Sequence, residues 1–312
     1  MNQSMHIAFC VNDNYVKYIT VTIKSLIENN LQHYIYIYIA IDILSMANRV
    51  RLEKLISEYN NIKLEILLVN DAPLKSLKNG NWPIQIWYRI LLPQLLPSSV
   101  KKVLYLDADT LVITDLQELF SLDMSGIAIA ASMDIQSFDQ KTFDRCGYEY
   151  NKQYICSGIL LMNLEYWRKN NLTHKILEWA NQNNNRIQFP DQDAINYICR
   201  DSKIILPLRY GILNAYFYSD NFYHGLWRAQ LKDCIEKPVL IHYAGCYPWI
   251  KGFSKHIMYK EWFKYNEKLK DKIKVEYLPS NWLFFKIIIW RILHPFKKQK
   301  LISIDKIKKK LS

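Results

Sequence analysis

The chain contains 312 residues, half of them hydrophobic and only 8 of them glycine, a composition that excludes a disordered or fibrous protein. Its formal net charge of +12 is uneven, because residues 281–312 hold nine Lys or Arg against the single acid Asp305. The charge of the remaining chain is nearly balanced, which argues against an extended nucleic-acid-binding surface. The length suits one large domain with an appendage.

Strand-like and helix-like segments alternate through the first half of the chain. The predicted strands are residues 6–12, 34–41, 62–69, 103–106 and 127–132. Helical spacing of apolar residues follows the first strand at 15–30, and Ser45 is a favourable N-cap for a second helix that extends to Ile56. Residues 83–92 form a short helical segment that carries Arg89. This alternation predicts an open α/β sheet that is mostly parallel.

The cysteines and the N-terminal residues indicate in which cellular compartment the protein is expected. The six cysteines are Cys10, Cys146, Cys156, Cys199, Cys234 and Cys246. They are scattered and include no Cys-x-x-Cys pair, so we expect reduced thiols without disulfides. Residues 1–6 are polar and lead directly into a strand, which does not resemble a signal peptide. We therefore expect a cytoplasmic protein.

Polar side chains follow two of the predicted strands, where ligands bind in open α/β sheets. Asn12, Asn14 and Tyr15 follow the first strand, although Asn in this place can equally serve as a helix-capping turn. Asp107 and Asp109 follow the fourth strand. Two carboxylates at the end of a buried strand suit a hard divalent cation, although a lone Asp-x-Asp can also be a solvated or capping pair.

A histidine at a further strand end strengthens the metal hypothesis. Residues 238–243 are strand-like and contain His242, which could complete an O/O/N ligand set suited to Mn²⁺, with Mg²⁺ as the alternative. A single histidine in this place can also be a structural hydrogen-bonding residue. Gly245 follows closely and would allow the backbone to approach a phosphate.

A second acidic segment, Asp191-Gln192-Asp193, opens an amphipathic helix. Acids are favourable in a first helical turn, so capping alone could explain them. The functional alternative is a polar wall that contacts sugar hydroxyls.

Taken in order, these segments resemble the family-eight retaining glycosyltransferases, which include bacterial lipopolysaccharide galactosyl- and glucosyltransferases and glycogenin. The matching segments are IAFCVNDNY (7–15), Tyr88-Arg89, VLYLDADTLV (103–112), SGILLMNLEYWR (157–168), PDQDAIN (190–196) and HYAGCYPW (242–249). The resemblance spans about residues 5–265. It implies a GT-A type nucleotide-diphosphosugar transferase fold, a UDP-sugar donor, Mn²⁺ and retention of the anomeric configuration.

The resemblance also implies roles for single residues. Donor contacts would come from Asn12, Asn14, Tyr15, Arg89, Asp107, Asp191, Gly245 and Lys251. Among them, the first three match positions that hold uracil and ribose. Asp107, Asp109 and His242 match the metal ligands. Asp191 matches a sugar-hydroxyl contact, and Gln192 matches the residue near the anomeric carbon, so these two are the catalytic candidates.

Three positions depart from the family pattern. Asn12 stands where an acid is usual, and Cys156 replaces the usual Asn before Ser-Gly, which removes a donor to the sugar. The usual Lys before Pro-Trp is absent, and Lys251, three residues after Pro248, is the candidate replacement.

Gln192 is a poor nucleophile, so we favour same-face attack by the acceptor hydroxyl, assisted by the departing phosphate oxygen. Double displacement through a neighbouring acid, Asp191 or Asp193, is the alternative.

The chain is expected to divide into a GT-A domain at 1–278 and a basic amphipathic tail at 279–312. Residues 282–293 are strongly apolar, but this segment is shorter than the roughly 20 residues that span a bilayer. An apolar face with a basic rim suits attachment to the inner face of an anionic membrane. The alternative is that the apolar segment packs on the protein's own core.

The sequence is also compatible with two other functional classes. A haloacid-dehalogenase-type phosphotransferase also carries a strand-end Asp pair, but its motif is Asp-x-Asp-x-Thr, and here Thr110 directly follows Asp109. The second class is a non-enzymatic basic protein that binds membrane or nucleic acid.

Overall fold

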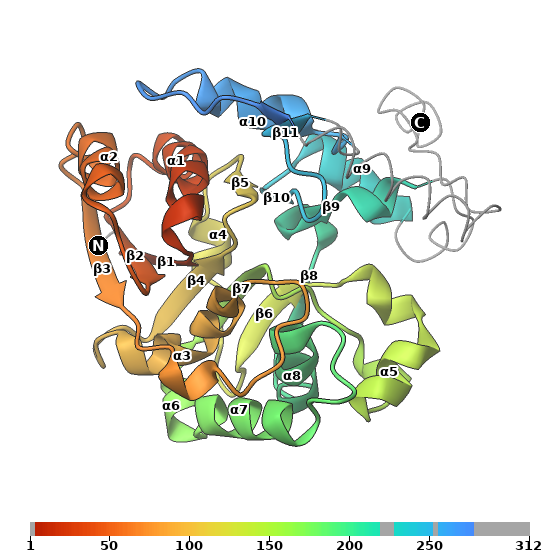
Figure 1. The fold of residues 1–312 in the computed structure, drawn as a ribbon. Helices are drawn as coiled ribbons and strands as arrows, with labels where there is room; N and C mark the ends of the chain where they lie inside the picture. Colours follow the sequence, from red (N-terminus) through yellow and green to blue (C-terminus); the bar gives the residue numbers. More distant parts are fainter. Residues whose placement is uncertain (1–3, 219–227, 252–254, 278–312) are drawn as a thin grey trace.

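A seven-stranded sheet forms the centre of the computed structural model, which describes residues 4–218, 228–251 and 255–277 (Figure 1). In spatial order its strands are β3 (Ile62–Leu68), β2 (Ile35–Ile41), β1 (Met5–Cys10), β4 (Lys102–Leu106), β7 (Ile159–Asn163), β6 (Ile129–Ser132) and β8 (Lys203–Leu206). Only β7 among them runs antiparallel to its neighbours. The sheet is therefore mostly parallel, as predicted.

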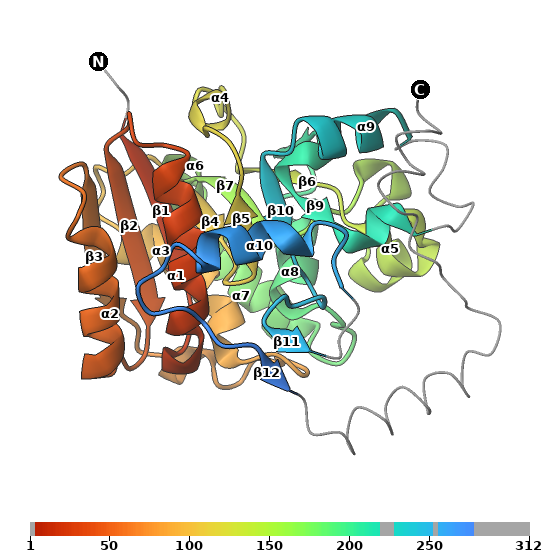
Figure 2. The same ribbon diagram turned by 90° about the horizontal axis from the view of Figure 1, so that it is seen from above.

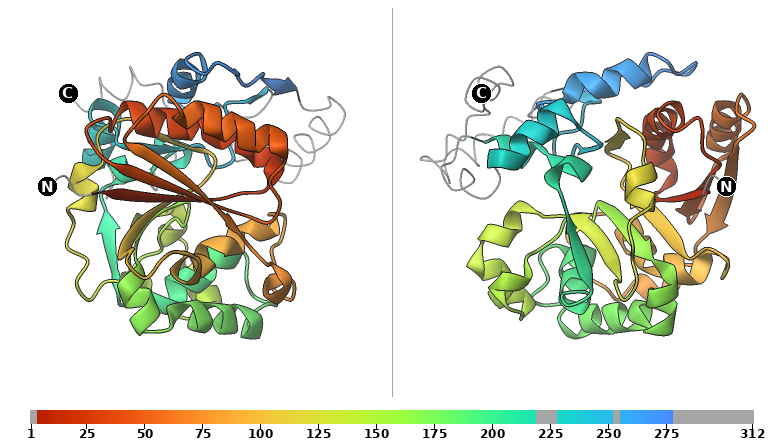
Figure 3. Two further views of the ribbon diagram at one scale, coloured as in Figure 1. Left: turned by 90° about the vertical axis from the view of Figure 1, so that its left-hand side faces the viewer. Right: turned by 180° about the vertical axis from the view of Figure 1, so that it is seen from behind.

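Helices cover both faces of this sheet and enclose two apolar cores (Figures 1 and 3). On one face lie α1 (Asp13–Glu28), α2 (Met46–Ile56) and α4 (Gln117–Phe120). On the other lie α3 (Tyr88–Leu95), α6 (Leu164–Lys169), α7 (Leu172–Gln182) and α8 (Pro190–Ile198). A further helix, α5 (Gln140–Cys146), packs against α8. Strands buried on both faces explain why β2 and β4 are almost continuously apolar.

Local capping fixes where the first two helices begin. The Asn12 side chain accepts a hydrogen bond from the Tyr15 backbone N–H at 3.2 Å and caps α1. The Ser45 hydroxyl accepts one from the Asn48 N–H at 3.3 Å and caps α2, as predicted. Asn12 therefore belongs to the helix cap, and β1 ends two residues earlier, at Cys10.

A smaller β-structure lies beside the main sheet. It contains β5 (Thr110–Val112), β10 (Leu240–His242) and β9 (Ile212–Leu213), and a two-stranded pair joins β11 (Ile250–Lys251) to β12 (Glu276–Tyr277). Helices α9 (Arg228–Glu236) and α10 (Tyr259–Asn266) flank it, and α10 lies beside α1 (Figure 2). A third core fills this region and contains several large aromatic residues, among which Trp249 stacks on Tyr18 with ring centroids 4.3 Å apart.

The predicted tail at 279–312 lies outside the described residues, so its helix, its membrane attachment and the boundary near 278 stay predictions. Within the described ranges, every helix is too short or too polar to cross a bilayer. All six cysteines are free thiols.

Candidate active site

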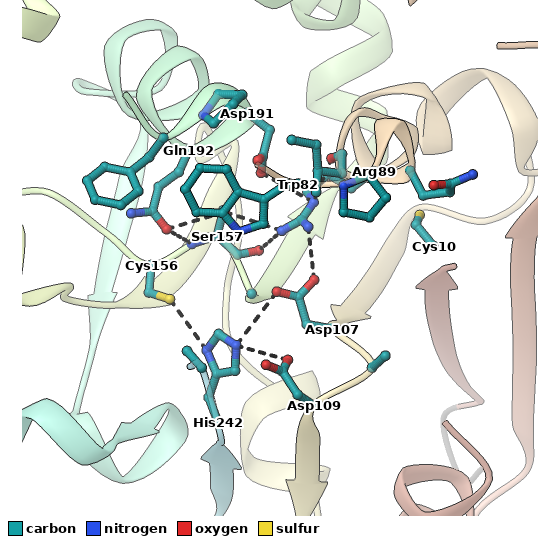
Figure 4. Close-up of a pocket in the computed structure, with 18 of the residues that line it drawn as sticks. Cys10, Trp82, Arg89, Asp107, Asp109, Cys156, Ser157, Asp191, Gln192 and His242 are labelled. Atoms are coloured by element: carbon teal, nitrogen blue, oxygen red, sulfur yellow. Dashed lines mark hydrogen bonds and ion pairs between the residues drawn. The ribbon is translucent and has the colours of Figure 1, made fainter. Parts of the chain in front are cut away.

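A cavity of about 430 Å³ opens at the carboxyl ends of β1 and β4 (Figure 4). It also meets the end of β10 and the first turn of α8. The predicted site residues that line it are Asn12, Tyr15, Arg89, Asp107, Asp109, Asp191, Gln192, His242 and Gly245. Segments more than 200 residues apart in the sequence therefore meet at one place. The ends of β1 and β4 meet because parallel strands end at the same edge of a sheet, and β10 is brought there separately.

Strand pairing brings His242 to the aspartates. The chain leaves β4, passes through Asp107 and Asp109, and enters β5, which pairs antiparallel with β10. In that register His242 lies opposite Thr110, and the Tyr243 N–H donates to the Asp109 carbonyl at 2.8 Å. The histidine is thereby held next to the Asp-x-Asp segment by backbone hydrogen bonds.

The side chains of Asp107, Asp109 and His242 converge on one point (Figure 4). His242 Nε2 lies 3.2 Å from Asp109 Oδ1 and 3.6 Å from Asp107 Oδ2, and one potential ligand atom from each residue lies within 4.8 Å of the others. Two carboxylates and one imidazole in this arrangement fit a divalent cation of the Mn²⁺ or Mg²⁺ type. The predicted ligand set is therefore assembled in the fold.

Electrostatics around these ligands also favour a cation. Burial raises the pKa of Asp107, and the nearby Asp109 carboxylate adds to that rise, while Arg89 opposes it. Burial alone would lower the pKa of His242, but attraction to Asp109 and then Cys156 places it well above its usual value. Positive charge at this point is thus favourable, whether a proton or a metal ion supplies it.

Gly158 makes room for the three ligands, and sequence reasoning did not single it out. A Cβ at this position would lie 2.2 Å from His242 Cε1 and 2.6 Å from Asp107 Oδ2. Real Cβ atoms do not approach other atoms so closely, so any side chain here would displace the ligands. A glycine just before a buried strand was the signal that could have found it.

Arg89 is a buried cation that links two groups of acids. Its Nη2 donates to Asp107 Oδ1 at 2.9 Å, and its Nε lies 3.3 Å from Asp191 Oδ2. Its Nη1 donates to the Ser157 carbonyl at 2.6 Å. Burial alone would lower the Arg89 pKa, but the two carboxylates raise it, so the guanidinium remains charged in the interior.

Gln192 is fixed at the cavity wall opposite the metal ligands. Its Oε1 accepts a hydrogen bond from the Ser157 N–H at 2.8 Å, and its Nε2 lies 3.5 Å from Asp134 Oδ2. Asp134, whose pKa is raised by burial, also lines the cavity and was missed by sequence reasoning. An amide held at both ends keeps one orientation toward the cavity.

Asp193 does not belong to this cavity. It accepts hydrogen bonds from Arg145 at 2.8 Å, from Tyr154 at 2.6 Å and from the backbone N–H groups of Gln188 and Phe189. Asp193 therefore has a structural role, whereas Asp191 lines the cavity, a difference that the sequence alone does not reveal.

Two predicted donor contacts, Asn14 and Lys251, do not line the cavity. Asn14 is exposed on the first turn of α1, and Lys251 is exposed on β11. Gly245, in contrast, lines the cavity with φ +67°, a conformation that favours glycine, and the space beside its missing Cβ is open.

Cys156 and Trp82 are further residues of the cavity wall. The sulfur of Cys156 lies 3.5 Å from His242 Nδ1, on the side of the ring away from the aspartates. A partner on the second ring nitrogen orients a metal-binding histidine. Trp82 is 42% exposed at the cavity and belongs to the loop before α3, which carries no sequence signal beyond its aromatic residue.

Comparison with known proteins identifies the family of the chain. The model of glycosyl transferase family 8 matches residues 6–251, which contain every metal-ligand candidate. The chain is 28% identical over 252 residues to a lipopolysaccharide 1,2-glucosyltransferase of Escherichia coli, covering 79% of this chain and 74% of that one. It is 27% identical to general stress protein A of Bacillus subtilis, with 85% and 93% coverage.

A solved structure shows the same fold. The galactosyltransferase LgtC, determined in complex with donor and acceptor sugar analogues, superposes with a TM-score of 0.75, covering 89% of this chain and 99% of that one at 24% identity. This likeness confirms the expected GT-A type fold. The phosphotransferase and non-enzymatic alternatives find no support in these matches. Since the family model matches well over half of the sequence, the chain belongs to glycosyl transferase family 8.

Proposed function

We propose that this glycosyltransferase moves a hexose, galactose or glucose, from a UDP-sugar to a saccharide acceptor of a cell-surface glycan such as lipopolysaccharide or capsule, with retention of the anomeric configuration. The observation that carries this proposal is the convergence of Asp107, Asp109 and His242 in a cavity whose opposite wall holds Gln192. The likeness to lipopolysaccharide glucosyltransferases supports the acceptor class.

Asp107, Asp109 and His242 would hold the divalent cation, Mn²⁺ in the first place and Mg²⁺ as the alternative. A cation bound there supplies Lewis-acid stabilisation of the leaving diphosphate, an effect of several kcal/mol. Arg89 holds the Asp107 carboxylate in place from the other side through its 2.9 Å hydrogen bond. The buried guanidinium thus keeps one ligand oriented before any donor arrives.

The donor would lie along the cavity from Asn12 to Asp191. Asn12 and Tyr15, at the start of α1, stand where the nucleoside would bind, and the Gly245 backbone stands where the diphosphate would pass. Asp191 lines the sugar end of the cavity, and its buried Oδ2 lies 3.3 Å from Arg89 Nε. A carboxylate at this wall, held in place by a guanidinium, suits a sugar hydroxyl.

Gln192 supports same-face attack by the acceptor hydroxyl. Its amide is a poor nucleophile, yet its fixed orientation allows it to steer the sugar without forming a bond. Asp193, one of the two acids considered for double displacement, has its oxygens engaged by at least four donors outside the cavity. Asp191 is left as the alternative nucleophile, and its carboxylate forms an ion pair with Arg89.

A screen of UDP-sugars for metal-dependent hydrolysis tests the proposal. We expect UDP release from UDP-galactose or UDP-glucose in the presence of Mn²⁺, its loss in excess chelator, and, with an acceptor, a product whose anomeric configuration matches the donor by NMR. Turnover that persists in chelator would remove the metal from the mechanism. An inverted product would exclude same-face attack and double displacement alike.

The tail would attach the enzyme to the inner face of an anionic membrane. A chain truncated after Pro279 should stay soluble and still hydrolyse UDP-sugar, but should no longer sediment with anionic liposomes. If the truncated chain unfolds, or if the full chain ignores such liposomes at low salt, the tail has a structural role instead.

A further inference from the structure

A second cavity, of about 270 Å³, lies on the outer side of the molecule and shares no lining residue with the first. Its lining comes from α1, from α2 and the residues that follow it, and from residues 268–271 after α10. Helices α1 and α2 lie side by side (Figures 1 and 2). The volume of the cavity far exceeds the roughly 10–15 Å³ that one water molecule needs.

Cations dominate the lining of this second cavity. They are Lys24, Arg51, Lys54, Lys268 and Lys270, against the acids Glu58 and Asp271. The cavity is therefore electropositive on a domain whose overall charge, without the tail, is nearly balanced.

Some of these cations are neutralised by carboxylates. Glu28 pairs with Lys24 at 3.2 Å and also with Lys268, while Glu58 pairs with Lys270 at 2.5 Å. These pairs tie the segment after α10 to α1 and to the residues that follow α2. They fix the walls of the cavity.

Arg51 and Lys54 remain without an ion pair among the described residues. The Arg51 Nε is buried and has no hydrogen-bond partner there, and its Nη1 reaches Asn48 Oδ1 only at 3.4 Å. Leaving a buried donor of a charged group unsatisfied is destabilising. The half-buried guanidinium that carries this donor lines the cavity next to a second unpaired cation, Lys54, so the two side chains are poised for an anion that is not part of the chain.

We propose that the cavity between α1 and α2 is a binding site for a phosphate group, held by Arg51 and Lys54. A guanidinium offers parallel N–H donors that match two oxygens of a phosphate, and an ammonium adds a point charge. The phosphate could belong to a lipid headgroup or to a soluble phosphate compound, and the experiment separates these sources. The site is independent of the glycosyl transfer proposed above.

Calorimetric titration of the full chain with inorganic phosphate, after removal of divalent metals, tests the site. We expect saturable binding by the wild type and about tenfold weaker binding by Arg51→Gln, since a hydrogen bond to a charged group contributes about 1.5 kcal/mol or more. Arg51→Lys should also weaken binding, because it keeps the charge but loses the parallel N–H donors of the guanidinium. Lys54→Gln, at an exposed helix position, serves if the Arg51 variants do not fold. The matched control is Lys175→Gln on the exposed side of α7, which should bind as the wild type does.

Sedimentation with phosphatidylcholine vesicles, with and without phosphatidylglycerol, identifies the source of the phosphate. If a lipid headgroup occupies the site, Arg51→Gln should sediment less than the wild type with the anionic vesicles only, since any contribution of the tail is equal in both. If the source is soluble, the two chains sediment alike although their phosphate affinities differ. The proposal is wrong if the wild type shows no saturable phosphate binding, or if Arg51→Gln and Lys54→Gln both bind phosphate as the wild type does.

Discussion

Asp107 and Asp109 follow β4, whereas Asp191 and Asp193 open α8, and in each pair one residue separates the two acids. The first pair converges on His242, with both carboxylates beside one imidazole nitrogen. The second pair diverges, because residues two apart on a helix point roughly 200° away from each other. Asp191 therefore faces the cavity, and Asp193 faces the packing between α8 and α5.

The same Asp-x-Asp spacing therefore has different consequences in different backbone conformations. In the turn between two strands, an Asp-x-Asp segment can wrap around one point. In a helical turn, the two acids enter different environments: Asp191 lines the cavity, and Asp193 forms a buried ion pair with Arg145.

The largest effect is expected for Asp109→Asn. Removing one ligand charge should lower turnover by about 10³-fold, since the metal contributes several kcal/mol and each 1.36 kcal/mol is tenfold in rate. Mn²⁺ binding, followed by electron paramagnetic resonance, should weaken in parallel while the circular dichroism spectrum stays unchanged. Asp193→Asn is the matched control and should still bind Mn²⁺. Full activity of Asp109→Asn would refute the metal assignment.

Asp193→Asn should instead act on stability. It would place an amide N–H₂ among donors and leave Arg145 without its buried partner, so the free energy of unfolding should fall by about 3 kcal/mol. Asp191→Asn should cost about 1 kcal/mol, because Arg89 retains Asp107. Urea denaturation measures both values. Equal losses of unfolding free energy in Asp191→Asn and Asp193→Asn would contradict the different roles assigned to these two acids.

Gln192→Ala should lower kcat by about 30-fold, a loss of about 2 kcal/mol in transition-state stabilisation, while UDP affinity changes little. The side chain lies between the Ser157 N–H and Asp134, next in sequence to Asp191, the proposed sugar contact. Isothermal titration with UDP separates the two effects. The control is Gln182→Ala, on the exposed end of α7. A collapse of UDP affinity together with kcat would assign Gln192 to the nucleotide site or to the fold.

Gly158→Ala should weaken Mn²⁺ binding by about tenfold, because the new methyl group displaces Asp107 and His242. Gly126→Ala is a useful comparison. Gly126 has φ +74° but open space at its Cβ position, so its substitution should lower the melting temperature without changing metal affinity. Unchanged Mn²⁺ affinity in Gly158→Ala would mean that the convergence of the first pair does not depend on this glycine.

Sequence reasoning reached much of the sheet and of the site because both depend on local patterns. The buried strands ending before Asn12 and Asp107 are apolar runs that stop at polar residues, and His242 ends a similar run. Ligands in open α/β sheets lie beyond the strand ends, so Asp107 and Asp109 could be placed at the site from the sequence. His242 could only be suggested as their partner, because its strand belongs to the smaller sheet and reaches the aspartates by pairing with β5.

Other features depend on long-range packing, which a local pattern does not contain. The position of β7 between β4 and β6 follows from which strands pair, and its own apolar sequence would suit either direction. The partners of Asp193 come from five positions between Arg145 and Phe189. The contact of Cys156 with His242 joins residues 86 apart. Neither could be read from spacing.

Arg89 gives the contrast between the two aspartate pairs one more consequence. Its guanidinium touches one member of each pair, Asp107 at 2.9 Å and Asp191 at 3.3 Å. The positive charge of Arg89 therefore stabilises both carboxylates, and loss of one carboxylate changes the electrostatic interaction of Arg89 with the other. Substitutions of Asp107 and Asp191 should for this reason be non-additive, with a coupling energy of about 0.5–3 kcal/mol in a double-mutant cycle. The proposed metal binding at Asp107 and the proposed sugar orientation at Asp191 would then be thermodynamically linked through one buried side chain.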